Sequence, residues 1–364
     1  MTKYELGNIL IYEQPTKYIV KSENYDDAFA TPVLTPGQTF ILGYTAETEG
    51  VYSAPLPVII FDDFTTATKL VNFPFKVKSS AMKILKPANE NVFLPYWYYF
   101  LSSLKVDNGL HKRYWISTFA NRQVHCPSFQ EQKRIAERLD KVQELIAKQK
   151  EQIAKLDLLI KSRFLDMFGD PITNPKGWIV RQIGQVSKIV SGTTPSTQNP
   201  IYWQGNLPWL TPAEIPDNMN YINNTQRKIS LKAVRDCSLR LLPRGTVILS
   251  SRAPIGKVAI AGVPLYCNQG FKNLILDDKQ MNAVFVCYLL RQRVTEIISL
   301  GRGATFKEIS KDIVSHISIY VPPLFLQNQF ANFVKSVEQQ KEVFSARLSH
   351  LEILYKSLMQ EYFG

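Results

Sequence analysis

Two stretches of the chain carry apolar residues at alternating steps of four and three, the pattern of a helix with one buried seam. They cover residues 130–169 and 327–364, and their closing parts align without a gap at a shift of 195 residues, Leu156 on Leu351. A seam sustained over at least about four heptads is typical of a coiled coil. A repeat of about half the chain indicates that a globular segment followed by a long helix is used twice.

The seam residues define one face of each expected helix. In order along the chain they are Ile135, Leu139, Val142, Ile146, Ile153, Leu156 and Ile160, then Val334, Val337, Phe344, Leu348, Leu351, Tyr355 and Leu358. Polar Gln149 and Lys341 interrupt the two seams, and a polar seam residue can fix the register of a helix pair. Gly169 followed by Pro171 marks the end of the first helix.

Neither helix is expected to be stable alone, because most helix stability comes from burying the apolar face. The sequence therefore predicts a mixed α/β fold in which two globular domains are separated by two long helices that form an antiparallel coiled coil with pseudo-two-fold symmetry. The predicted divisions are a first domain, a first helix, a second domain and a second helix, at residues 1–128, 129–170, 171–322 and 323–364. Helices of about 40 residues at about 1.5 Å each would be about 60 Å long.

The globular segments show shorter elements. Buried strands are predicted at residues 58–61 and 246–249, and amphipathic helices at 92–104 and 283–300. Apolar content of 45% and charged content of 20% are ordinary for globular domains. No apolar run reaches 18 residues and no basic-then-apolar leader opens the chain, so we expect neither a membrane span nor a secretory signal.

The four cysteines are widely spaced, without a CxxC motif or a nearby histidine pair. That spacing predicts no metal site and no disulfide framework, and cytoplasmic residence follows as the default. The net charge is +12, and residues 173–326 hold 18 Lys and Arg against 8 Asp and Glu. A basic field of this size suits a polyanion, and helices of about 60 Å exceed a DNA turn of about 34–36 Å.

An ordered set of short motifs resembles the specificity subunit of type I restriction–modification enzymes. The motifs are FDDFT (61–65), VKSSAMKIL (77–85), HKRYWIS (111–117), EQKRIAERL (131–139), SRFLDMFGDP (162–171), NPKGW (174–178), SGTTPS (191–196), LPWLTPAEI (207–215), SSRAPIGKVAI (250–260), CNQGFKNL (267–274) and GATFKEIS (303–310). The resemblance implies two target recognition domains that each read one half of a split site in double-stranded DNA. It also implies helices that set the spacing and hold two modification subunits, to which restriction subunits add, with catalysis left to these partners. No cofactor, membrane or small-molecule substrate is implied.

The residues expected to contact DNA are polar side chains in these motifs. They are Lys78, Ser79, Ser80, Lys83, Lys112, Arg113 and Tyr114 in the first domain, and Ser251, Arg252, Lys257, Asn268, Gln269, Lys272, Arg302, Thr305 and Lys307 in the second. Asn268 and Gln269 have side chains that can bond adenine, and Arg or Lys suits guanine. Lys272, Arg302 and Lys307 are expected to contact phosphates. Asn268 and Gln269 could instead bond their own turn. Asp62 and Asp63 could either accept a hydrogen bond from cytosine N4 or cap a loop.

Alternatives from other classes are weaker. Residues 199–202, Asn-Pro-Ile-Tyr, resemble an amino-methyltransferase motif, but the third residue differs and no glycine-rich cofactor turn accompanies them. Paired acids at 62–63 and 277–278 could be nuclease ligands, although acids in turns are commoner. We therefore predict no catalytic residue and no bound metal. The remaining alternatives are a stand-alone DNA methyltransferase or nuclease and a coiled-coil adaptor without DNA specificity, which would lack salt-dependent DNA affinity.

Overall fold

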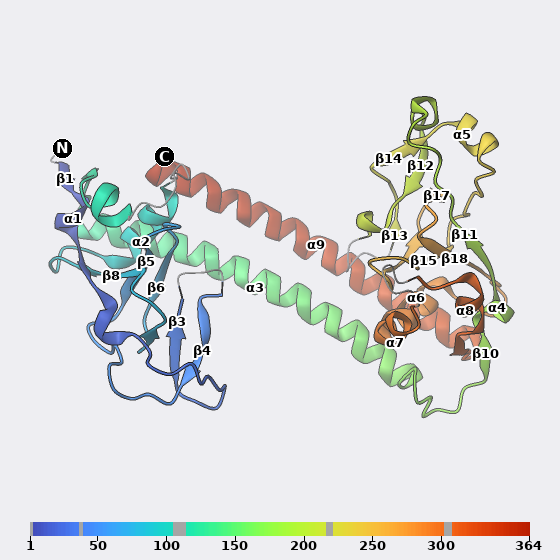
Figure 1. The fold of residues 1–364 in the computed structure, drawn as a ribbon, viewed down its shortest axis with the longest axis horizontal. Coiled ribbons are helices and arrows are strands. Elements are labelled where there is room, and N and C mark those ends of the chain that lie inside the picture. The colour runs from blue at the N-terminus through green and yellow to red at the C-terminus, as the bar shows by residue number, and fades with distance from the viewer. Residues whose placement is uncertain (1–2, 36–38, 105–113, 216–220, 302–307) are drawn as a thin grey trace. The chain divides into compact units, whose positions relative to one another are not determined.

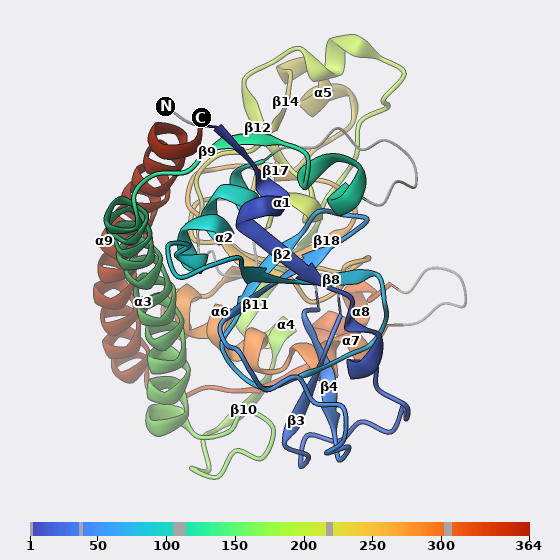
Figure 2. The same ribbon diagram turned by 90° about the vertical axis from the view of Figure 1, so that its left-hand side faces the viewer.

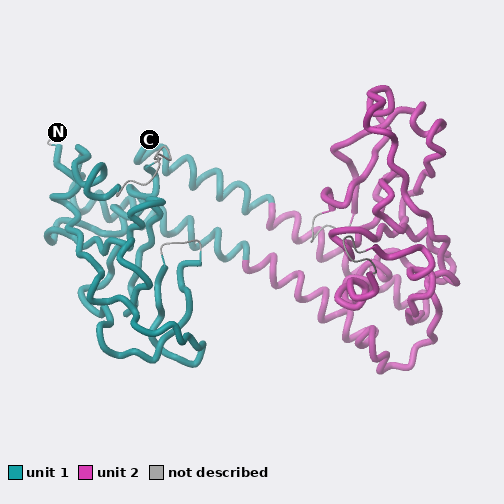
Figure 3. Tube along the Cα trace, in the orientation of Figure 1, with its two compact units in different colours: residues 1–150, 346–364 teal, residues 151–345 magenta. Residues whose placement is uncertain are grey.

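The computed structural model describes residues 3–35, 39–104, 114–215, 221–301 and 308–364. The chain forms two compact units, residues 1–150 with 346–364 and residues 151–345 (Figure 3). Each unit contains a β-rich domain and a part of both long helices. We call the two β-rich parts the first domain and the second domain.

The elements follow in chain order (Figure 1). The first domain and first long helix comprise β1 (Lys3–Glu5), α1 (Leu6–Ile9), β2 (Leu10–Glu13), η1 (Pro15–Tyr18), β3 (Thr31–Leu34), β4 (Ile41–Thr45), β5 (Val58–Asp62), β6 (Thr68–Val71), β7 (Lys76–Val77), β8 (Met82–Pro87), α2 (Leu94–Ser103), η2 (Trp115–Phe119), β9 (Gln123–His125) and α3 (Phe129–Phe168). The second domain and second long helix comprise β10 (Val180–Gln182), α4 (Ile183–Val186), β11 (Ser187–Ser191), η3 (Pro200–Trp203), β12 (Leu207–Leu210), η4 (Pro212–Glu214), β13 (Tyr221–Ile222), β14 (Arg227–Ile229), α5 (Leu231–Asp236), β15 (Val247–Ser250), β16 (Val258–Ala261), β17 (Tyr266–Cys267), β18 (Phe271–Leu276), α6 (Ala283–Gln292), α7 (Val294–Ser299), α8 (Lys311–His316), β19 (Ser318–Tyr320) and α9 (Leu324–Phe363).

The two domains share one sheet topology although their sequences match poorly. The first has the strand orders β2-β8-β5-β6, β4-β3-β7 and β1-β9. The second repeats them as β11-β18-β15-β16, extended by β13, with β14-β12-β17 and β10-β19. The parallel pairs also correspond, β3 with β7 and β12 with β17. The duplication inferred from the long helices therefore extends through both β-rich domains.

The strand registers place two lysines at the same point of this common sheet. Lys83 in β8 lies opposite Phe61 in β5, and Lys272 in β18 lies opposite Leu249 in β15. In each domain the residue before the lysine pairs with the last residue of the central strand, Asp62 or Ser250. Residues 78–83 and 267–272 therefore lead into equivalent strands of the two domains.

The long helices α3 and α9 each have 40 residues and pack against each other along the predicted seams (Figure 2). In the first unit, Ile135, Leu139 and Val142 near the start of α3 share a buried cluster with Leu358 near the end of α9. In the second unit the end of α3 meets the first half of α9: Ile160 is buried in one cluster with Phe330 and Val334. The helices therefore run antiparallel.

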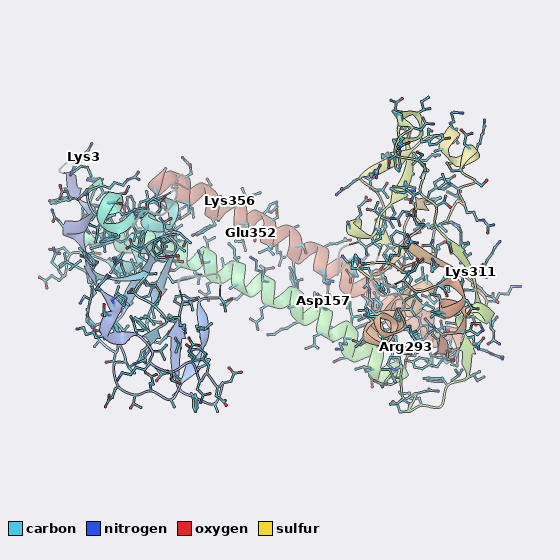
Figure 4. The ribbon with its side chains drawn as sticks, in the orientation of Figure 1. Lys3, Asp157, Arg293, Lys311, Glu352 and Lys356 are labelled. Atoms are coloured by element: carbon cyan, nitrogen blue, oxygen red, sulfur yellow. The ribbon has the colours of Figure 1, made fainter. Side chains whose placement is uncertain are left out.

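Polar contacts between the helices follow the same direction. Arg138 donates to the Tyr362 hydroxyl at 2.8 Å, and Lys150 pairs with Glu352 at 3.2 Å. In the second unit, Lys341 is 8% exposed and its Nζ lies 2.6 Å from Asp157. Figure 4 labels Asp157 on α3 and Glu352 on α9. The remaining predicted seam residues, Ile146, Ile153, Leu156, Phe344, Leu348, Leu351 and Tyr355, are half-buried.

One predicted helix is divided. The stretch 283–300 forms α6 and α7, which are separated by Arg293 with φ −105° and ψ 14°. The guanidinium of Arg293 is turned inward, where it donates to the Ser318 carbonyl and pairs with Glu296 at 2.6 Å. The prediction of one continuous helix was wrong here, because apolar spacing does not reveal the long-range hydrogen bond that Arg293 makes at the break.

Candidate nucleic-acid interface

Loops from distant parts of the sequence meet at one edge of the second domain. The loop after β11 crosses the loop before β18: Thr193 donates its backbone N–H to the Cys267 carbonyl at 2.9 Å, and the Thr194 hydroxyl donates to Gln269 Oε1. At Gly192 there is no room for a side chain against the Asn268 carbonyl. The motifs at 191–196 and 267–274, far apart in sequence, therefore form one surface.

Two further motifs join this surface. The Asn268 N–H donates to the Leu210 carbonyl at 3.1 Å, which ties the loop to the end of β12. The Ser251 N–H donates to the Gly270 carbonyl at 2.7 Å, which ties it to the end of β15. Backbone hydrogen bonds thus hold these loops in one arrangement, as a surface that reads a fixed chemical pattern requires.

Arg252 and Lys272 share one carboxylate, that of Glu308. Arg252 Nη2 lies 2.8 Å and Lys272 Nζ 3.2 Å from Glu308 oxygens, and Lys272 also donates to the buried Ser251 hydroxyl at 3.4 Å. Burial raises the pKa of Glu308, but the hydrogen bonds from both cations outweigh it and hold that pKa below its usual range. The Arg252 side chain is 48% exposed and that of Lys272 7%. Arg252 therefore faces solvent, while Lys272 is a buried side chain that pairs with Glu308 inside the domain.

The other predicted residues of the second domain differ in exposure and in hydrogen-bond partners. Asn268 Oδ1 accepts from the Gly270 N–H at 2.9 Å and so bonds its own turn, the alternative considered for it. Gln269 is exposed beside Thr194. Lys257 Nζ donates to the Ile215 carbonyl at 2.8 Å. Arg302, Thr305 and Lys307 lie outside the described residues.

The first domain also contains a buried lysine paired with a carboxylate, although the partner residues differ. Lys83 is 1% exposed, and its Nζ lies 3.2 Å from Asp63 Oδ2 and 2.6 Å from Gln14 Oε1. Asp63 Oδ1 also accepts from the Trp115 N–H at 2.9 Å. Lys83 and Lys272 are thus equivalent buried lysines with a carboxylate beside each. In this arrangement the ammonium groups of both lysines bond to side chains within their own domains.

The other first-domain candidates divide by exposure. Lys78 is partly exposed and pairs with Glu23 at 2.6 Å, and Ser79 accepts the Ala81 N–H within its turn. Ser80 is exposed, whereas Tyr114 is 7% exposed and donates its N–H to the Asp63 carbonyl. Lys112 and Arg113 lie outside the described residues. Asp62 accepts from the Phe64 N–H at 3.0 Å, so it caps the loop after β5.

Sequence reasoning missed Arg227 in the second domain. Its guanidinium lies 3.7 Å from the ring centre of Trp203 and 5.1 Å from that of Trp209. Trp209 Nε1 donates to the Thr193 carbonyl, so this stacked group adjoins the loop surface. A cation held on aromatic faces keeps its planar donors oriented. The pairing of Trp209 with Arg227 across β12 and β14 was the missing signal, and it requires the strand register.

The described part of the chain offers few groups of the kind that an enzyme site needs. There, no cluster of three or more His, Cys, Asp or Glu side chains could hold a metal ion. Asn199 of the methyltransferase-like motif accepts from the Ile201 N–H at 3.2 Å and caps a short helix. Asp277 accepts from the Lys279 N–H at 3.1 Å in a turn. The described helices include none that is long and apolar enough to cross a membrane.

Comparison with known proteins decides the family. The sequence matches the type I restriction modification DNA specificity domain over residues 1–157 and 175–352. The chain belongs to the type I restriction–modification specificity subunits. It is 34% identical over 349 residues to the EcoR124I/EcoR124II specificity subunit of Escherichia coli, a match that covers 90% of this chain and 84% of that protein. Such a subunit is the non-catalytic, DNA-specificity member of its complex.

Other relatives agree with this assignment. The MjaIX specificity subunit of Methanocaldococcus jannaschii is 35% identical over 179 residues, which cover 46% of this chain and 41% of that protein. The fold is similar to the crystal structure of the type I S subunit from M. genitalium, with a TM-score of 0.63, 14% identity and coverage of 100% and 96% of the two chains. The paired long helices and duplicated domains are therefore the architecture of specificity subunits.

Proposed function

We propose that each domain of this specificity subunit reads one half of a two-part, asymmetric DNA site. The observation that carries the proposal is one sheet topology used twice, with unlike side chains at its loops. In the second domain the surface presents Arg252 and Gln269, and in the first it presents Lys78 and Ser80. A common framework with different surface residues is suited to two different half-sites. The divisions at 1–128, 129–170, 171–322 and 323–364 belong to this proposal, as does residence in the cytoplasm.

The subunit also carries two modification subunits, and through them restriction subunits. Support comes from apolar side chains that the helix pair leaves exposed at equivalent positions. On α3, Leu158 is 62% and Leu159 is 46% exposed, and on α9, Ile353 is 61% and Leu354 is 43% exposed. The two pairs are 195 residues apart, the shift of the internal repeat. Similar apolar pairs at equivalent positions, Leu-Leu on one helix and Ile-Leu on the other, fit two copies of one partner better than two unlike partners.

A loop substitution tests the assignment of half-sites. Gln269→Ala should relax base preference at one position of one half-site by about 1–3 kcal/mol, because a side chain able to bond a base edge is removed. The other half-site and the gap should stay unchanged. Selection of bound duplexes from a random library, using the full complex, measures both. Gln329→Ala, at an exposed position on α9, is the matched control. A change in both half-sites of the Gln269 variant would contradict the assignment.

A further inference from the structure

Each long helix begins with a glutamine that is fully enclosed. Gln132 is the fourth residue of α3 and Gln327 is the fourth residue of α9. Both are 0% exposed, and they are separated by the 195-residue shift of the repeat. A glutamine in the first turn of a helix ordinarily faces solvent, so burial of both requires a reason.

Gln132 joins three parts of the first unit. Its Oε1 accepts from the Phe93 N–H at 2.9 Å and from Trp97 Nε1 at 3.0 Å. Its Nε2 donates to the carbonyls of Asn91 at 3.1 Å and Pro127 at 2.9 Å. The start of α2, the segment before it and the approach to α3 thus meet at one side-chain amide.

Gln327 makes the same connections in the second unit. Its Oε1 accepts from the Asn282 N–H at 2.9 Å, and its Nε2 donates to the carbonyls of Gln280 at 3.0 Å and Pro322 at 2.8 Å. Asn282 precedes α6 as Phe93 precedes α2. In both units the carbonyls belong to the residue two before that N–H and the residue five before the glutamine. We call these two arrangements the glutamine clamps.

The clamps fix the orientation of each long helix relative to its domain more strictly than apolar packing alone does. The apolar seam beside them permits small rotations at little cost, whereas hydrogen bonds weaken steeply away from linear geometry. Turning a long helix relative to its domain would leave buried backbone groups without a hydrogen-bond partner, which is unfavourable. Each domain is therefore held at one angle to the helix that leaves it.

We propose that Gln132 and Gln327 are positioning residues that fix the angle between each recognition domain and its long helix, and thereby the length of the gap between the two half-sites. This inference rests on the proposed two-part recognition. An added base pair moves one half-site by about 3.4 Å and turns it by about 35°. A domain held at one angle tolerates neither change, and a domain released from its clamp tolerates both.

The test is a selection experiment on the full complex with its modification subunits. Gln132→Met and Gln327→Met keep the side-chain volume and remove the clamp bonds. Wild type should select one gap length, and each variant should select two or three, with the penalty for a gap wrong by one base pair reduced at least about tenfold, or about 1.4 kcal/mol. Both half-sites should be retained. Gln130→Met and Gln329→Met, at exposed positions two residues from each clamp glutamine, should behave as wild type.

The outcomes separate the clamp from a general loss of stability and from the proposed function. Gln132→Glu and Gln327→Glu keep the acceptor and the shape but lose both donors, and they serve where a Met variant does not fold. Folded clamp variants that keep a single gap length as strictly as wild type, whatever their melting temperature, would overturn the inference. A wild-type complex that selects no two-part site would instead overturn the proposed function.

Discussion

Replacing Asp63 with alanine should lower the free energy of unfolding of the first domain by about 3–5 kcal/mol, because it leaves Lys83 buried without its counter-ion. The two side chains are 1% and 2% exposed, so water does not replace the lost carboxylate. The substitution also removes the acceptor for the Trp115 N–H. Hydrogen exchange in β5 and β8 reports this loss within the first domain.

Two further variants isolate the buried charge as the cause. Glu23→Ala removes the partner of Lys78 from a pair whose side chains are 35% and 82% exposed, and it should cost at most about 1 kcal/mol. Adding Lys83→Met to Asp63→Ala should recover part of the loss, because no unpaired charge then remains in the interior. Equal protection in the Asp63 variant and wild type would show that Lys83 does not depend on this pair.

Loss of partner binding is the expected result of placing charge on the exposed apolar pairs. Leu158→Glu and Ile353→Glu together should remove both modification subunits, and each alone should remove one. An apolar side chain contributes about 1.5–3 kcal/mol when a partner covers it, and an unpaired carboxylate in its place adds a desolvation cost. Light scattering on the assembled complex gives the number of bound subunits.

Conservative variants provide the control for partner binding. Leu158→Met and Ile353→Met keep an apolar side chain of similar volume and should bind both modification subunits. Helix content should be the same in all variants, because both positions lie outside the seam. A doubly charged variant that still holds two modification subunits would place their docking surface elsewhere.

The long helices could be predicted from the sequence because their seam is a local and periodic signal. Leu139 and Leu358 are buried as the pattern requires. Their antiparallel direction followed from connectivity and needed no side-chain detail. The same method predicted one helix at 283–300 and missed the break at Arg293, where a long-range bond to the Ser318 carbonyl competes with local helix propensity.

The candidate site was predicted less completely, since burial of a charged residue depends on partners far away in sequence. The sequence predicted DNA contacts for Lys83 and Lys272 because lysines are ordinarily exposed. Their environment depends on Asp63 in one domain and on Glu308, 36 residues away, in the other. The glutamine clamps were missed for the same reason: nothing in the local sequence marks Gln132 and Gln327 as buried, and only tertiary packing encloses them.

The most direct test of the account is methylome sequencing of cells that express this subunit with its modification subunits. We predict a single asymmetric motif, made of two short specific parts separated by a gap of fixed length, with methylation in both parts. Each part corresponds to one domain and the gap to the helix pair with its clamps. A continuous short motif, or a motif with two identical halves, would contradict reading by two unlike domains.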